Sequence, residues 1–140
     1  MKRSRLALLV VAVVLVGMQA IRPSRDNPPV TGDLDAPADV KLVLRRSCYD
    51  CHSNETRWPW YTNIAPVSWL VANHVKEGRA ELNFSQWSSY EPKKREHKLE
   101  EIEDEVREGE MPIGNYVWIH GDAKLSEADS KLVQEWAQTR

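Results

Sequence analysis

Both cysteines of this 140-residue chain lie in one five-residue segment, Cys48-Tyr49-Asp50-Cys51-His52. Cys48 and Cys51 are three positions apart, so on a helix their thiols lie on the same side, about one turn from each other. His52 follows directly and adds an imidazole beside the two sulfur atoms. The chain has no other cysteine, so both of its thiols serve this one segment. The rest of the chain is expected to fold around the group that these three side chains bind.

The order Cys-x-x-Cys-His is the attachment pattern of a c-type haem. Two thiols one turn apart reach the two vinyl groups at one edge of a porphyrin and form thioethers, and the neighbouring imidazole binds the iron. We therefore predict one covalent haem c, with Cys48 and Cys51 as the thioether residues and His52 as the proximal iron ligand.

Three other uses of this segment remain open. A thioredoxin-like dithiol needs a βαβ setting, which the sequence patterns do not show. A zinc site needs a fourth ligand besides Cys48, Cys51 and His52, supplied by another histidine. A disulfide between the two cysteines closes a very short loop and contributes little stability.

The predicted distal iron ligand is Met111, in the loop Gly109-Glu110-Met111-Pro112. A thioether is a weak ligand that suits low-spin iron and raises its reduction potential. The alternatives are His74, which falls on the apolar face of a predicted helix, and His120. An open sixth position is the remaining possibility.

The first 21 residues have the order of an export signal, with a basic start at Met1–Arg5 and an unbroken apolar run at Leu6–Met18. We predict a signal peptide or an N-terminal membrane anchor over residues 1–21. Retention is favoured because no small-x-small pair closes the run. The basic start stays in the cytoplasm, so the domain is expected in the periplasm or on the extracytoplasmic face, anchored to the cytoplasmic membrane by residues 6–21.

Behind this segment we predict a Pro-rich extended linker over residues 22–37 and one domain over residues 38–140. No stretch alternates with period two, so the fold is expected to be all-α. Long Trp-rich connections join the helices. The four predicted helices run from about Asp35 or Pro37 to Cys48, from Pro66 to Gly78, from about Pro92 to Gly109, and from Ser126 toward the C-terminus. The last begins with the capping pattern of Ser126 and Asp129. The faces expected to be buried are Val40, Val43 and Leu44 in the first helix, Val67, Leu70, Val71 and Val75 in the second, Leu99, Ile102 and Val106 in the third, and Leu132, Val133 and Trp136 in the fourth.

Composition favours a core built around a cofactor and excludes nucleic acid as a partner. The chain has six Trp but one Phe, and most of the indoles lie outside the predicted helices, where they need a large flat partner.

Net charge is −2, and residues 1–22 hold four basic residues and no acid. The exported part is therefore clearly acidic, whereas a nucleic-acid binder needs a basic face.

With these residues placed, the chain resembles the cytochrome c superfamily, and more closely a family of small haem-binding domains in exported bacterial proteins. The likeness covers about residues 38–138 and implies a cytochrome c-like helical fold around one covalent haem. The segments that carry it are Ser47–Ser53, Thr56 with Trp58–Tyr61, Ala65–Trp69, Glu77–Arg79, Leu82–Ser85, Met111-Pro112, and Ala123 with Leu125-Ser126.

The expected function is that of a monohaem c-type cytochrome, which carries single electrons between redox partner proteins on the outer side of the cytoplasmic membrane. We predict no enzymatic activity, because no constellation of acid, base and nucleophile stands out. The alternative is a haem-based sensor or a small haem enzyme such as a peroxidase, with an open or displaceable sixth ligand. A third possibility is an assembly module in which the haem is structural.

Overall fold

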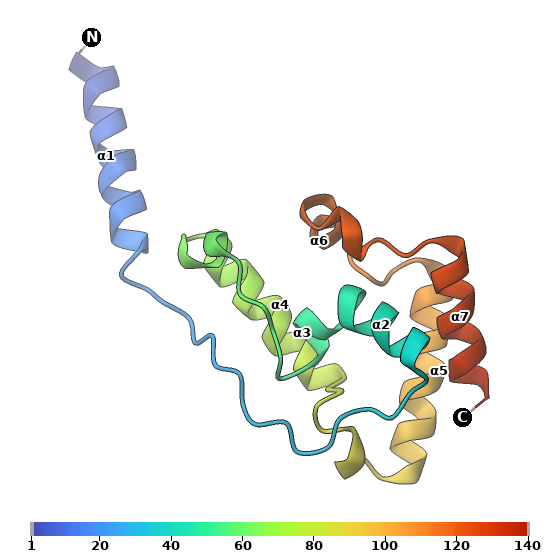
Figure 1. Cartoon of the computed structure of the whole chain (residues 1–140). Coiled ribbons are helices and arrows are strands. Elements are labelled where there is room, and N and C mark those ends of the chain that lie inside the picture. Colours follow the sequence, from blue (N-terminus) through green and yellow to red (C-terminus); the bar gives the residue numbers. More distant parts are fainter. Residues whose placement is uncertain (1, 140) are drawn as a thin grey trace.

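The computed structural model describes residues 2–139 and is helical, with no strand among those residues, which confirms the predicted all-α class (Figure 1). A single isolated bridge pairs Gly32 with Gln86. Three short 3-10 helices lie in the connections, namely η1 (Trp60–Asn63), η2 (Trp87–Ser89) and η3 (Gly121–Ala123). The α-helices are α1 (Lys2–Met18), α2 (Ala38–Ser47), α3 (Tyr49–His52), α4 (Val67–Glu81), α5 (Pro92–Glu108), α6 (Gly114–Ile119) and α7 (Glu127–Gln138).

Helix α1 projects from the body of the protein (Figure 1). Every leucine and valine between Leu6 and Val16 is exposed. Among residues 2–139, no helix combines the length and the apolar character that crossing a membrane requires.

The core forms where α2, α5 and α7 meet. Helix α5 contributes the predicted apolar stripe Leu99, Ile102 and Val106, all buried, and ends at Gly109 in the left-handed region with φ 75°. Helix α7 begins with the predicted capping box, in which the Ser126 hydroxyl accepts from the Asp129 backbone N–H at 3.1 Å. These two helices confirm the sequence pattern closely, because local signals set their ends and their buried faces.

Helix α4 differs from its prediction in two respects. It continues past Gly78 and ends at Glu81, so Gly78 is not its terminus. Val67 and Leu70 were expected on the buried face but are exposed, whereas Val75 is buried as expected. Gly78 thus lies inside α4, where its missing side chain leaves room for Cys51.

The segment predicted as a linker is extended, and its second half packs on the domain. The backbone N–H of Gly32 donates to the Ser85 carbonyl at 3.0 Å, and that of Leu34 donates to Phe84 at 3.0 Å. Leu34 is 2% exposed and belongs to the core cluster. The packed part of the chain therefore begins before residue 38.

Asp33 ties this segment to α2 and α3. Its carboxylate accepts from Lys41 Nζ at 2.6 Å and from the Tyr49 hydroxyl at 2.7 Å, and it lies 3.3 Å from the Arg45 guanidinium. Burial acts to raise the pKa of Asp33, but the hydrogen bonds from Lys41 and Tyr49, with the nearby positive charges, outweigh it and lower the pKa below its ordinary value.

A depressed carboxylate pKa stabilises the fold above the unfolded value, about 4, and this contribution is lost as the pH falls through the folded value. We expect Asp33→Asn to lower the free energy of unfolding by about 1 kcal/mol at pH 7, because solvent screens part of the interaction. The difference from wild type should shrink as the pH falls below the unfolded value. Urea unfolding at pH 7 and pH 3 measures both values, with exposed Asp35→Asn as the control; a pH-independent difference would contradict this assignment.

Candidate functional site

A cavity of about 610 Å³ lies between α2, α3, α4 and α5 and the loop before α6. Its lining includes Cys48, Cys51, His52 and Met111. The structure thus brings together all four residues that the sequence singled out, although Met111 is far from the others along the chain. The remaining walls are mainly hydrocarbon, supplied by residues such as Leu44, Leu82, Phe84, Ile102, Val106, Pro112 and Ile113.

Cys48 separates α2 from α3, and α3 is the single turn that carries Cys51 and His52. The backbone N–H of His52 donates to the Cys48 carbonyl at 2.9 Å, which closes this turn. Both cysteines are free and half-buried. Burial raises the pKa of Cys48 to about 12; burial and the neighbouring Asp50 charge raise the pKa of Cys51 to about 11. The pair therefore consists of neutral thiols at pH 7, unlike the activated thiolates of dithiol enzymes.

His52 is held in one tautomer by backbone carbonyls of α4 and the residue after it. Its Nδ1 lies 2.9 Å from the Gly78 oxygen and 3.2 Å from the Leu82 oxygen, so Nδ1 carries the proton and donates. Nε2 is left with its lone pair, and burial lowers the pKa of His52, which keeps the ring neutral. A neutral imidazole with one nitrogen fixed by a backbone carbonyl is the form that binds a metal.

Gly78 makes this arrangement possible. A Cβ at this position would lie 2.7 Å from the carbonyl oxygen of Cys51 and 3.2 Å from its Cβ. Glycine therefore lets the backbone of α4 approach α3 closely enough for the Gly78 oxygen to reach His52. The sequence pattern predicted Gly78 only as the end of a helix; the signal for its actual role is a lone glycine inside a helical pattern without turn residues beside it.

Met111 is half-buried in the cavity wall, in the loop that follows α5. Its backbone N–H donates to the Glu105 carbonyl at 3.2 Å, so the end of α5 holds this loop. His74 also lines the cavity. His120 instead pairs with the Tyr61 hydroxyl and stacks on the Tyr116 ring, with 4.5 Å between ring centroids.

The buried carboxylate of Asp50 connects several parts of the site, and the sequence patterns gave no indication of this role. Asp50 is 8% exposed and accepts from the Arg57 backbone N–H at 3.0 Å and from two guanidinium nitrogens of Arg57 at 3.2 and 3.1 Å. The hydroxyl of Tyr116, which lines the cavity, donates to Asp50 at 2.8 Å. Asp50 thereby connects α3 to α6, and it raises the pKa of Arg57.

Carboxylates also line the cavity. Glu77, Glu81 and Glu105 are exposed, and Glu101 is partly buried. Lys98 is 2.5 Å from Glu101 and 4.0 Å from Glu81. The solvent edge of the cavity is therefore predominantly acidic.

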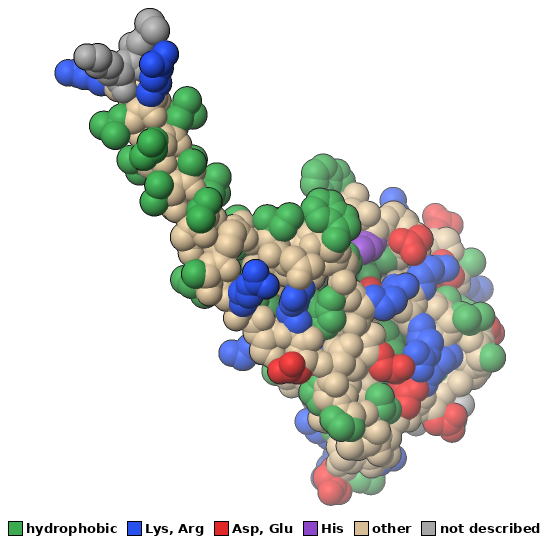
Figure 2. All heavy atoms as spheres, turned by 60° about the vertical axis from the view of Figure 1, so that its left-hand side comes forward, with side chains coloured by type: hydrophobic (Ala, Val, Ile, Leu, Met, Phe, Trp, Pro, Cys, Tyr) green, Lys and Arg blue, Asp and Glu red, His purple; other side chains and the backbone are tan. Residues whose placement is uncertain are grey.

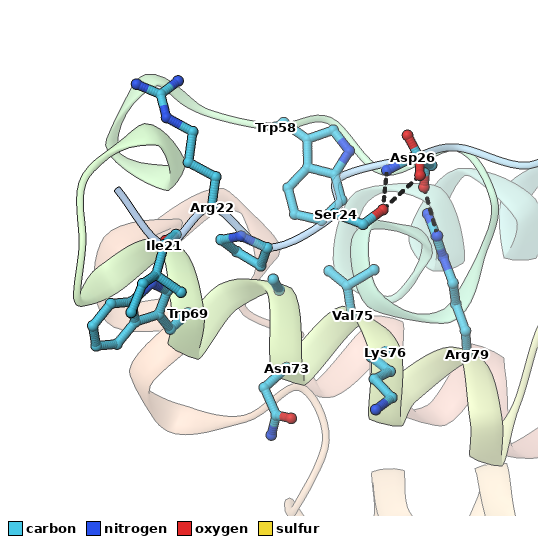
Figure 3. Close-up of a pocket in the computed structure, with 12 residues that line it drawn as sticks. Ile21, Arg22, Ser24, Asp26, Trp58, Trp69, Asn73, Val75, Lys76 and Arg79 are labelled. Carbon is cyan, nitrogen blue, oxygen red and sulfur yellow. Dashed lines mark hydrogen bonds between the residues drawn. The ribbon is translucent and has the colours of Figure 1, made fainter. Parts of the chain in front are cut away.

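A second cavity, of about 540 Å³, lies along another side of α4 (Figure 3). One wall is the segment that follows α1, from Ile21 to Asp26, and Trp58 and Trp69 flank it. Arg79 donates to the Asp26 carbonyl at 2.8 Å and holds this segment on α4. Its lining contains no cysteine or histidine. The residues predicted to bind the cofactor all line the first cavity.

A sequence profile described as a haem-binding domain matches residues 13–139. The chain belongs to this family. No curated protein and no solved structure gives a significant match.

The cavity of this haem-binding domain fits its cofactor on structural grounds. About 610 Å³ lies within the range of about 300–1,000 Å³ that is typical of ligand pockets. Nε2 of His52 supplies a free lone pair in a mainly hydrocarbon enclosure. The Ser47 hydroxyl lines the cavity, is buried and has no hydrogen-bond partner among the described residues, so a polar group of a bound haem would satisfy it.

Gly78→Ala should destabilise the domain by about 1–3 kcal/mol, because the added methyl forces α4 away from α3. The same movement lengthens the hydrogen bond from His52, so the haem content after expression should also fall. Urea unfolding and the haem-to-protein absorbance ratio measure the two effects.

Gly121→Ala is the matched control, because a Cβ there meets no atom within 4 Å. It should leave both measurements close to wild type. Equal effects of the two substitutions would contradict the role given to Gly78.

Proposed function

We propose that this haem-binding domain is a monohaem c-type cytochrome that carries single electrons on the outer side of the cytoplasmic membrane. The observation that supports this most directly is the shared cavity of Cys48, Cys51, His52 and Met111. It places two thiols, a ligand-competent imidazole and a thioether in one enclosure. This is the residue set of a His/Met-ligated haem c, and we propose that the helices around it form a cytochrome c-like domain.

Each residue has a separate part in the proposal. Cys48 and Cys51 would hold the haem through two thioethers, His52 would bind the iron through Nε2, and Met111 would bind it through sulfur. When bound, the haem supplies an iron that cycles between the ferrous and ferric states. Leu44, Phe84 and Ile102 exclude water from the cavity, which limits reorganisation when the charge changes.

The proposed role is electron transfer and not bond-making chemistry. The buried walls of the cavity are mainly hydrocarbon, and the exposed polar groups among its lining residues are carboxylates at the solvent edge. We propose that the redox partner presents a basic surface to Glu77, Glu81 and Glu105. Such complementarity speeds encounter and weakens as salt is added.

The proposed location follows from the basic and apolar order of residues 1–21. Covalent haem attachment takes place on the far side of the cytoplasmic membrane, where an exported chain folds. We propose that residues 6–21 are retained and hold the domain at the membrane. Intact-mass measurement of the purified protein distinguishes a retained segment from a cleaved signal peptide.

Met111→Ala tests electron carriage by removing the distal thioether. The wild-type protein should be low-spin, with sharp ferrous α and β bands and a weak far-red sulfur-to-iron band in the ferric form. The variant should lose the far-red band, bind carbon monoxide readily, and have a reduction potential lower by on the order of 0.1 V.

His74→Ala is the control, because His74 lines the same cavity, and it should keep the wild-type spectrum. A spectrum that responds to His74→Ala and not to Met111→Ala would make His74 the ligand. A high-spin spectrum of the wild-type protein would contradict electron carriage and support the alternative function, that of a haem sensor or small haem enzyme.

Cys51→Ala tests covalent attachment. The variant should keep one thioether at most, which shifts the α band of its pyridine haemochrome to longer wavelength and lowers the yield of holoprotein. Replacing both cysteines should remove all haem that survives a denaturing gel. Unchanged attachment in the double variant would contradict a covalent haem c.

A further inference from the structure

We infer that the end of the domain to which α1 is joined rests on a lipid bilayer. This inference depends on the proposed location and on retention of the N-terminal segment. The surface concerned, here called the lipid-facing surface, consists of Trp60, Ile64, Val67, Leu70, Trp118 and Ile119.

All members of the lipid-facing surface are large hydrophobic residues that the fold leaves exposed. Trp118 is 86% exposed and Trp60 is 75% exposed. They come from η1 and the residue after it, from the start of α4, and from α6, and a hydrogen bond between Tyr61 in η1 and His120 at the end of α6 joins these parts. Figure 2 shows large hydrophobic side chains gathered at the upper edge of the body, near the base of α1. An apolar patch of this kind marks an interaction site.

Hydrogen bonds fix the end of α1 to this same part of the domain. The Gln19 side chain accepts from the Ala65 backbone N–H at 3.0 Å and donates to the Ala65 carbonyl at 3.2 Å. Trp69 Nε1 donates to the Ile21 carbonyl at 2.8 Å. In Figure 1, α1 rises from the end of the body where η1 and α6 lie. The helix and the lipid-facing surface therefore face one environment together.

The chemistry of both parts favours lipid over a protein partner. Helix α1 exposes leucine and valine side chains all around its axis, and a helix without a polar face needs apolar surroundings on every side. Tryptophan is the residue that membrane–water interfaces enrich. Arg22 and Arg25 lie a few residues after the apolar run, so a bilayer that takes up α1 brings its anionic phosphates close to both. A bilayer is the occupant that covers α1 and the indoles at once.

The test uses the full chain with its haem, reconstituted into vesicles of phosphatidylethanolamine and phosphatidylglycerol that contain a diazirine-bearing phospholipid. After photolysis, mass spectrometry locates the residues that carry lipid label. Label is expected on α1 and on the lipid-facing surface, severalfold above that on Leu42. Leu42 is the internal control because it is 71% exposed but lies on α2, which is not part of this surface.

Label confined to α1, or equal label on Leu42 and the lipid-facing surface, would overturn the inference. Crosslinks between two copies through Trp60 or Trp118, without lipid label there, would overturn it in favour of self-association. The double variant Trp60→Ser/Trp118→Ser should lose label from η1 and α6 severalfold while α1 stays labelled. The haem spectrum and reduction potential of the same samples report on electron carriage separately.

Discussion

The contact between α3 and α4 at Gly78 is the constraint on which the rest of the site depends. It brings a backbone carbonyl to Nδ1 of His52, and this hydrogen bond decides which ring nitrogen is free. The neighbouring Phe84 N–H donates to the His52 carbonyl at 2.8 Å, which extends the contact beyond the end of α4. The proposed iron ligand, His52, is thus oriented by backbone groups, which side-chain substitutions elsewhere disturb little.

Local signals in the sequence predict much of this fold. The capping box at Ser126, the glycine after α5 and the stripe of Leu99, Ile102 and Val106 each depend on residues within a few positions of one another. The Cys-x-x-Cys-His segment is local as well, and the cavity that contains it also contains Met111. The family match supports haem binding, while the roles of the individual residues stay predictions.

What the sequence could not predict depends on contacts between distant segments. Asp50 is buried because Arg57 and Tyr116 both donate to it, and nothing near Asp50 in the chain indicates Tyr116 as a partner. The Pro-rich sequence around Leu34 predicted a linker. Leu34 instead lies in the core, where its backbone N–H donates to the carbonyl of Phe84. The role of Gly78 in α4 could not be predicted for the same kind of reason, since it depends on Cys51, which lies far from Gly78 along the chain.

Helix α6 connects the cavity to the outer surface of the protein. Within six residues, Gly114–Ile119, it presents Tyr116 to the cavity and Trp118 to the exterior. The hydroxyl of Tyr116 holds α6 on Asp50, so this helix links the cavity lining to the exposed Trp118 indole. A contact made by that indole on the outside therefore reaches, through α6 and Asp50, the turn that carries Cys51 and His52, the proposed haem-binding residues.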